Sequence, residues 1–181
     1  MRVNSVEDAD ALASSAHEGQ TDRIGVAYVE HVRAVAAGLA PFGPELQMAG
    51  LLHDVIEDTS WTAGRLRAVG VPDRVVAVVE QVTNQPGVAY EDKLRTITGS
   101  RDATLVKIAD NAHNSRADRA VRLDPAARER LAAKYRAARA VLWPAASRED
   151  VAAILAVVNP DLLAELPSAL SRERRAPGGP R

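Results

Sequence analysis

Residues 49–59 read AGLLHDVIEDT and combine an apolar stripe with three acids and an imidazole. On a helix with His53 at 0°, a turn of about 100° per residue places Glu57 at about 40°. Asp54 and Asp58 follow at about 100° and 140°, while the apolar side chains fill the opposite arc. No Lys or Arg lies within the stretch or directly beside it. The pattern predicts a helix with one face in the core and one polar face that binds a cation.

The composition favours a single domain of closely packed helices. Of the 181 residues, 46% are hydrophobic but only two Trp, three Tyr and one Phe are aromatic, so Ala, Val and Leu must fill the core. A chain of this length can bury a sizeable core within one domain. The absence of cysteine excludes disulfides, thiolate metal sites and a cysteine nucleophile. Any metal must therefore be held by His and carboxylate side chains, which suit manganese, iron, zinc or magnesium.

Charge and hydropathy indicate a soluble protein. The net charge of −1 gives no bulk electrostatic reason to expect a nucleic-acid partner. No stretch approaches the roughly 18 consecutive apolar residues that suggest a membrane span. The first ten residues contain acids and no apolar run, unlike a signal peptide. We expect a cytoplasmic protein that binds neither nucleic acid nor membrane.

Hydrophobic periodicity and turn residues predict an all-α fold with about eight or nine helices. The valine-rich segment 75–82 would also suit a buried strand, but its length and its Pro-Asp-Arg start favour a helix. Expected helix starts with a capping side chain lie at Ser5, Asp102, Asp124 and Ser147. The predicted helices span residues 6–17, 25–39, 44–60, 63–68, 72–82, 90–97, 103–116, 125–143 and 151–158.

The domain is expected to span residues 1–170. From residue 171 onward the chain is dominated by Arg, Pro and Gly, a composition that cannot form a core. Residues 171–181 are therefore predicted to form a disordered tail.

A second polar helix face follows at residues 105–114, which read LVKIADNAHN. With Asp110 at 0°, Asn114 lies at about 40° and Lys107 at about 60°. For this helix alone, a surface ion pair between Asp110 and Lys107 is the simpler interpretation. A metal site needs ligands from separate elements, however, and beside the first cluster Asp110 becomes a fitting fourth ligand. His31 is the remaining candidate, although a lone His in a helix is more often structural.

The order His31, His53-Asp54, Asp110 resembles the pattern of the HD superfamily of metal-dependent phosphohydrolases. The stretches 49–59 and 105–114 are similar to the two signatures of the hydrolase domain in RelA/SpoT enzymes and small alarmone hydrolases. The similarity runs from about residue 9 to residue 143. It implies an HD-domain helical bundle, and because 181 residues leave no room for synthetase and regulatory domains, we expect a stand-alone hydrolase.

The resemblance implies hydrolysis of the 3′-pyrophosphate of guanosine tetra- or pentaphosphate at a single Mn²⁺ ion. A divalent ion acidifies water and neutralises phosphoryl charge, and a nearby carboxyl group can move the proton. Glu57 and Asp58 match the family's acid pair. The metal ligands that the resemblance implies are His31, His53, Asp54 and Asp110.

A small-molecule nucleotide is thus the expected partner. By the same resemblance, Asn114 and Tyr135 match residues that lie near the nucleotide. Arg23 lies where the family carries an Arg-Lys pair, and Lys107 could meet a phosphate, although a salt bridge to Asp110 or Glu57 is an equal alternative for that side chain.

Two departures from the family pattern keep other functions open. Val32 follows His31 where the family usually has Pro, and Asp22 precedes Arg23 in place of a cation. The second departure allows an HD phosphohydrolase that acts on another nucleotide phosphoester. A third alternative is a catalytically silent module that senses a nucleotide. Retention of the acid pair argues against it, because a module without catalysis has no need for those carboxylates.

Overall fold

The computed structural model describes residues 2–166, and the tail predicted at 171–181 lies outside them. Within the described residues there are eleven α-helices, three 3₁₀ helices and no strand, so the all-α prediction is confirmed. No described helix is both long and apolar enough to cross a membrane. The helices are α1 (Val6–Ala16), α2 (Tyr28–Leu39), α3 (Pro44–Leu52), α4 (Val55–Asp58), α5 (Ala63–Ala68), α6 (Asp73–Val82), α7 (Tyr90–Ile97), α8 (Arg101–Asn114), α9 (Ala117–Ala120), α10 (Pro125–Leu142) and α11 (Arg148–Val158), with 3₁₀ helices at Ala40–Phe42, Trp143–Ala145 and Pro160–Glu165.

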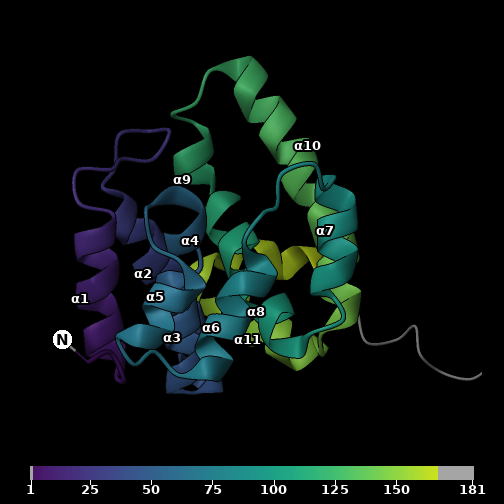
Figure 1. The fold of residues 1–181 in the computed structure, drawn as a ribbon. Helices are drawn as coiled ribbons and strands as arrows, with labels where there is room; N and C mark the ends of the chain where they lie inside the picture. The colour runs from purple at the N-terminus through teal and green to yellow at the C-terminus, as the bar shows by residue number, and fades with distance from the viewer. Residues whose placement is uncertain (1, 167–181) are drawn as a thin grey trace, which may run out of the picture.

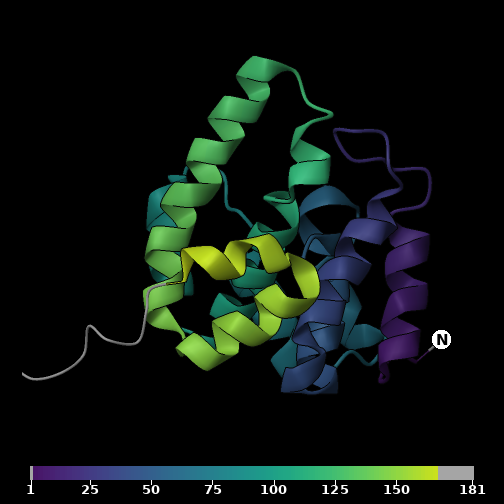
Figure 2. The ribbon, with the colours of Figure 1, turned by 180° about the vertical axis from the view of Figure 1, so that it is seen from behind.

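Helices α2 and α8 form the centre of the molecule. On one side, α3 packs against both of them, and α1 and α6 pack against α3 (Figure 1). On the other side, α11 packs across α2 and α8 (Figure 2). The loop between α1 and α2, the short helix α9 and the start of α10 stand along the same edge of the molecule in both views. That edge borders the functional cleft described below.

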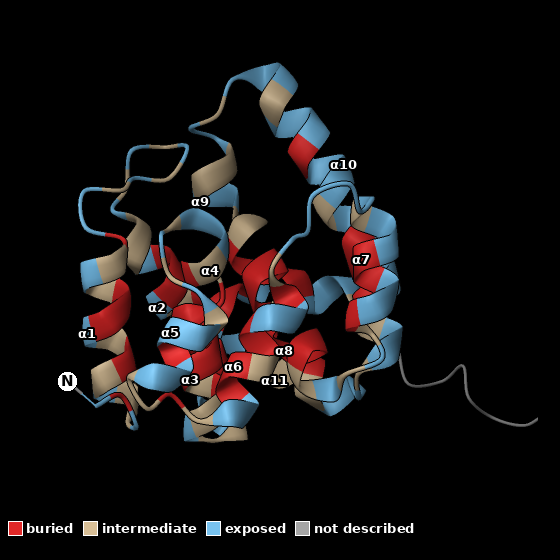
Figure 3. Cartoon of the chain, in the orientation of Figure 1, coloured by how far each residue is buried: buried red, intermediate tan, exposed pale blue. Residues whose placement is uncertain are grey.

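The core consists of aliphatic side chains, as the composition predicted. Buried residues are concentrated where α3, α6 and α8 face the interior (Figure 3), and no aromatic residue of the described chain is among them. Gly50 brings α3 close to α2, because a Cβ at this position would lie 2.9 Å from the Cα of Ala36. The largest fully buried side chains are Leu39, Leu46, Met48, Leu52, Leu66, Leu94, Ile97, Leu105, Ile108, Leu142, Ile154 and Leu155.

The valine-rich segment forms helix α6, so the preference for helix over strand is confirmed. Val75, Val76, Val79 and Val82 are buried at helical spacing, while Glu80 and Gln81 face solvent. A helix fits because this periodicity leaves one polar face, which a strand buried on both faces would lack.

Three of the four predicted helix caps are confirmed. The side chains of Ser5, Asp124 and Ser147 each accept a hydrogen bond from the first turn of the helix that follows. The prediction for Asp102 is wrong: Ser100 caps α8, and Asp102 lies inside the first turn, where its carboxylate pairs with Arg74 at 2.7 Å. The short helix α9 was not predicted.

The prediction of one continuous helix over residues 44–60 is also wrong. Helix α3 ends at Leu52 and α4 begins at Val55, so His53 and Asp54 form the break between them. The cause is a side-chain hydrogen bond: Nδ1 of His53 lies 2.7 Å from the carbonyl oxygen of Gly50. In a continuous α-helix this carbonyl would accept from the backbone N–H of residue 54.

Candidate metal centre

The break in the helix lets two adjacent residues face one site. On a helix, neighbouring side chains diverge by about 100°. Here Nε2 of His53 and Oδ2 of Asp54 lie 2.9 Å apart. The polar pair at the centre of the predicted motif is thus brought together by a turn, and not by the helical face that periodicity predicted.

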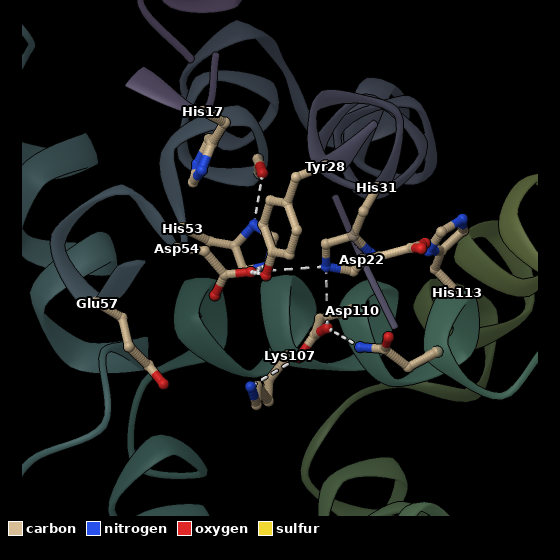
Figure 4. Close-up of polar contacts among 12 residues, drawn as sticks. His17, Asp22, Tyr28, His31, His53, Asp54, Glu57, Lys107, Asp110 and His113 are labelled. Atoms are coloured by element: carbon tan, nitrogen blue, oxygen red, sulfur yellow. Dashed lines mark hydrogen bonds and ion pairs between the residues drawn. The ribbon is translucent and has the colours of Figure 1, made fainter. Parts of the chain in front are cut away.

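Helices α2 and α8 add the other two predicted ligands. Nε2 of His31 lies 3.6 Å from Oδ2 of Asp54 and 3.5 Å from Oδ1 of Asp110. The four side chains point toward one another from α2, from the break between α3 and α4, and from α8 (Figure 4). Single ligand atoms from His31, His53 and Asp54 all lie within 4.8 Å of one another, a spacing that could hold a metal ion.

The hydrogen bonding of His53 suits a metal ligand. Nδ1 donates a proton to the Gly50 carbonyl, so Nε2 is the ring nitrogen left to bind a metal. That buried Nε2 has no hydrogen-bond partner among the described residues, yet it faces the Asp54 carboxylate. Tyr28 donates its hydroxyl proton to Oδ2 of Asp54 at 2.7 Å. Nε2 of His53 and Oδ2 of Asp54 are both atoms that can bind a metal, and a cation could be held between them.

A second imidazole orients His31. Nδ1 of His31 lies 2.7 Å from Nδ1 of His113, so one proton is shared between them. Burial and the nearby His31, Arg119 and Arg116 lower the pKa of His113 to about 3. A neutral His113 accepts the proton, which leaves Nε2 of His31 directed at the two carboxylates. His113 therefore lies directly behind a candidate ligand.

The two carboxylates of the cluster favour a positive charge beside them, on His31 or on a bound ion. Burial alone would lower the pKa of His31, but Asp110 and Asp54 raise it to about 9. Burial would likewise raise the pKa of both carboxyl groups. The imidazoles hold the pKa of Asp54 well below its usual range, and Lys107 and the imidazoles do the same for Asp110. Two ionised carboxylates and two imidazoles are a ligand set that fits a divalent cation.

Asp110 is held from two sides. Nζ of Lys107 lies 2.7 Å from Oδ2 of Asp110, and the side-chain amide of Asn114 donates to Oδ1. The predicted ion pair on α8 therefore exists, and it is buried in the site and not exposed on a surface. Asn114, which the resemblance matches to a residue near the nucleotide, thus also contacts a candidate ligand.

The predicted acid pair lies at the edge of the cluster. Glu57 was expected beside His53 on one helix face, but the helix break moves it away from the four converging side chains (Figure 4). Its two oxygens accept hydrogen bonds from the backbone N–H and the side-chain amide of Asn84, both at 2.9 Å. Burial and the charge of Asp54 raise the pKa of Asp58. Both carboxyl groups line the cleft that opens over the cluster.

A cleft of about 380 Å³ opens over the cluster, and all four predicted substrate contacts line it. Arg23 comes from the loop between α1 and α2, and Tyr135 from α10, while Lys107 and Asn114 project from α8. Arg23 is exposed and has no ion-pair partner among the described residues. The structure thus brings together, in one cavity, predicted residues that span more than half of the chain.

Sequence reasoning missed several residues of the cleft. Tyr28 lies one helical turn before His31, a spacing that could have identified it. Asn84, Tyr90, Arg119 and Lys134 carried no local signal, because the packing of distant helices brings them to the site. Lys134 lies over the ring of Tyr90, with 4.3 Å between its Nζ and the ring centroid.

Comparisons with known proteins find relatives in one functional group. The chain is 32% identical over 128 residues to the bifunctional (p)ppGpp synthase/hydrolase SpoT of Escherichia coli, an alignment that covers 64% of this chain and 18% of the relative. It is 36% identical over 124 residues to a guanosine-3′,5′-bis(diphosphate) 3′-pyrophosphohydrolase of Haemophilus influenzae, with 58% and 17% covered. A probable GTP pyrophosphokinase of Mycobacterium leprae is 34% identical over 160 residues, with 82% and 20% covered.

The chain spans at most about a fifth of the length of these curated relatives. No known protein-family profile matches it. Among solved structures, it shares its fold with a metazoan SpoT orthologue described as hydrolysing ppGpp, with a TM-score of 0.68 and 21% identity over 91% of this chain and 97% of the other. The sequence and fold comparisons therefore agree with the resemblance to RelA/SpoT enzymes that residues 49–59 and 105–114 indicated. This chain is thus similar in sequence to SpoT-type (p)ppGpp synthase/hydrolases and 3′-pyrophosphohydrolases, and it shares its fold with a metazoan SpoT orthologue.

Proposed function

We propose that this chain removes the 3′-pyrophosphate from guanosine tetra- or pentaphosphate with the help of one Mn²⁺ ion. The observation that carries the proposal is the convergence of the four predicted ligands in a cleft lined by basic and aromatic side chains. The activities for which the E. coli and H. influenzae relatives are named support the choice of substrate.

The ligands of the ion would be His31, His53, Asp54 and Asp110. A divalent ion bound there would acidify water and neutralise charge on the phosphoryl oxygens. The chain's own contribution is to hold this set in place before any ligand arrives. Tyr28 and Lys107 fix one oxygen of Asp54 and Asp110 respectively, and His113 fixes the orientation of His31.

Hydrolysis needs two proton movements, which we assign to Glu57 and Asp58 because both carboxyl groups line the cleft. Attack of a water oxygen on the phosphorus attached to O3′ breaks the P–O3′ bond and releases pyrophosphate. Glu57, oriented by Asn84, would take the proton that the water loses. Asp58, whose pKa is raised by burial and by Asp54, would deliver a proton to the departing O3′. The product then carries a free 3′-hydroxyl group.

The rest of the cleft provides binding groups for a nucleotide. Lys107 is positioned beside Asp110, where it could meet a phosphate near the reacting bond. Arg23 also lines the cleft, from the loop before α2. The rings of Tyr135 and Tyr90 offer apolar surfaces against which a base could stack.

A hydrolysis assay tests the proposal. Purified protein is incubated with Mn²⁺ and guanosine tetraphosphate, and release of pyrophosphate and GDP is measured beside a panel of ordinary nucleotides. We expect turnover that EDTA removes and that Asp54→Asn abolishes. Asp10→Asn is a matched control, because Asp10 forms an exposed ion pair with Arg33 and does not line the cleft.

The other outcomes point to different functions. Metal-dependent turnover of other nucleotides alone would keep the phosphohydrolase chemistry and discard the alarmone as substrate. Nucleotide binding without turnover, by a protein that holds metal, would instead support a sensing module.

A further inference from the structure

Arg119 reaches the cleft from the helix that the sequence did not predict. Its Nη1 donates a hydrogen bond to Oδ2 of Asp22 at 2.8 Å across 97 positions of sequence. The two side chains are 17% and 6% exposed, so this ion pair is largely protected from solvent. Both residues line the cleft that opens over the candidate metal centre.

Asp22 does not offer a free negative charge to the cleft. Its Oδ1 accepts hydrogen bonds from the backbone N–H groups of Ile24 and Val26 at 2.9 and 3.0 Å, and Oδ2 accepts from Arg119. Burial would raise the pKa of Asp22, but these donors outweigh burial and lower it. The carboxylate is therefore ionised and already bonded on both oxygens. Its effect is to hold the loop and the guanidinium in place.

The guanidinium of Arg119 has more donors than Asp22 uses. Arginine carries five N–H groups, and among contacts within residues 2–166 only Nη1 has a hydrogen-bond acceptor. The side chain stands in a cleft that also contains the cations Arg23 and Lys134, neither of which has an ion-pair partner in the described part of the chain. Together with Arg119, these residues bring three cationic side chains to the lining of the cleft.

We propose that Arg119 is a phosphate-binding residue of the cleft and that Asp22 positions it. The inference rests on the proposed function in one respect, because it takes the occupant of the cleft to be a phosphorylated nucleotide. A guanidinium suits this role because its planar donors can engage two phosphate oxygens at once. Fixing it beforehand through Asp22 reduces the ordering cost of binding.

A purely structural role for Arg119 would be to fasten α9 to the loop before α2. Arg122, two residues after α9, makes such a contact: its Nη2 donates to the carbonyl oxygen of Ile24 at 2.7 Å. Arg122 is exposed and does not line the cleft. The chain thus offers a matched pair of arginines that contact the same loop before α2, one lining the cleft and one outside it.

The test compares Arg119→Gln, Arg122→Gln and Asp22→Asn in the full chain, with Mn²⁺ and guanosine tetraphosphate. We expect Arg119→Gln to raise KM by roughly 10- to 100-fold with kcat within a few-fold, as for a lost hydrogen bond to a charged group. Arg122→Gln should leave KM within about threefold. Asp22→Asn should have an intermediate effect, since Arg119 remains but is held less firmly, and Arg119→Lys should restore part of the affinity. Equal shifts in KM for the two Gln variants would overturn the proposal. They would mean that Arg119, like Arg122, only holds α9 against the loop before α2.

A binding measurement in EDTA separates this inference from the proposed function. The probes are guanosine tetraphosphate, GTP and ATP, and the readout is the equilibrium dissociation constant for each. If the wild type hydrolyses no guanosine tetraphosphate, the proposed function fails, while loss of nucleotide affinity in Arg119→Gln but not in Arg122→Gln still supports this inference. An unchanged dissociation constant in Arg119→Gln overturns it, as does a wild type that binds none of the probes.

Discussion

One hydrogen bond determines which nitrogen of His31 faces the metal cluster. His113 is neutral and accepts the proton on Nδ1 of His31, so Nε2 is left for the carboxylates and for a metal. Groups that orient a metal-bound imidazole in this way commonly change metal affinity by about 10- to 100-fold when they are removed. His113 contributes to the site although it would not touch the ion.

We predict that His113→Ala weakens Mn²⁺ binding by about 10-fold or more, as measured by calorimetric titration of the metal-free protein. The substitution leaves every candidate ligand in place, so the loss would come from the freed imidazole of His31. His17→Ala is the comparison, because His17 is also buried but pairs with Gln20 and not with a ligand. Equal Mn²⁺ affinity in wild type and His113→Ala would contradict the assignment.

At the scale of the elements, the approach of α3 to α2 depends on Gly50. A Cβ there would lie 2.8 Å from Cδ1 of Leu39 and 3.1 Å from the backbone nitrogen of Ala36. The side chain of Leu39 can shift, but the backbone of α2 cannot do so without moving the helix that carries His31. The same residue supplies the carbonyl that orients His53.

We therefore predict that Gly50→Ala lowers the free energy of unfolding by about 1–3 kcal/mol, the usual cost of overpacking a core. Urea denaturation followed by circular dichroism measures it. Gly64→Ala in α5 is the matched control, since the nearest atom to an added Cβ is 3.9 Å away. That variant should be stabilised by about 0.4–1 kcal/mol through reduced freedom of the unfolded chain. Equal changes in both variants would show that helix propensity dominates and that close packing does not.

Hydrophobic periodicity predicted the long helices correctly. It did not predict helix ends at which a side chain takes the place of a backbone hydrogen-bond partner. Helix α6 was identified correctly because its buried valines recur at helical spacing. The break after α3 was missed because it depends on an imidazole that occupies the Gly50 carbonyl, and apolar spacing does not record such a bond. The start of α8 was misplaced because both Ser100 and Asp102 can cap a helix, and the pairing of Asp102 with Arg74 is a tertiary contact.

For the whole molecule, the sequence could predict residues that belong to recognisable motifs but not those that only the fold brings together. The two signatures identified the candidate ligands His53, Asp54 and Asp110. Nothing local marks Arg119 or Lys134, because their place in the cleft follows from where α9 and α10 pack. Asp22 illustrates the same limit, since its charge appeared unfavourable in the sequence and is neutralised by a partner 97 positions away.

The last prediction concerns how a metal would join the separate parts of the fold. Its four candidate ligands come from α2, the break between α3 and α4, and α8, so an ion that binds them stabilises the packing of these helices against one another. A ligand that binds only the folded state at about 100 times its dissociation constant adds about 2.7 kcal/mol. For a domain of this size, we expect Mn²⁺ to raise Tm by roughly 5–10 °C, as measured by thermal denaturation with and without EDTA.

Two variants test whether the ion binds at the candidate ligands. One changes a candidate ligand, and the other changes a cleft residue that contacts none of them in the described chain. Asp54→Asn should lose most of the Mn²⁺-dependent rise in Tm, because it removes a charged ligand. Arg119→Gln should keep the rise, because Arg119 contacts Asp22 and none of the candidate ligands. The same increase in Tm for Asp54→Asn and wild type would mean that the metal binds at other acids of the surface. Loss of the rise in Arg119→Gln would instead mean that Arg119 influences the metal centre, although its hydrogen bond within residues 2–166 is to Asp22 and not to a candidate ligand.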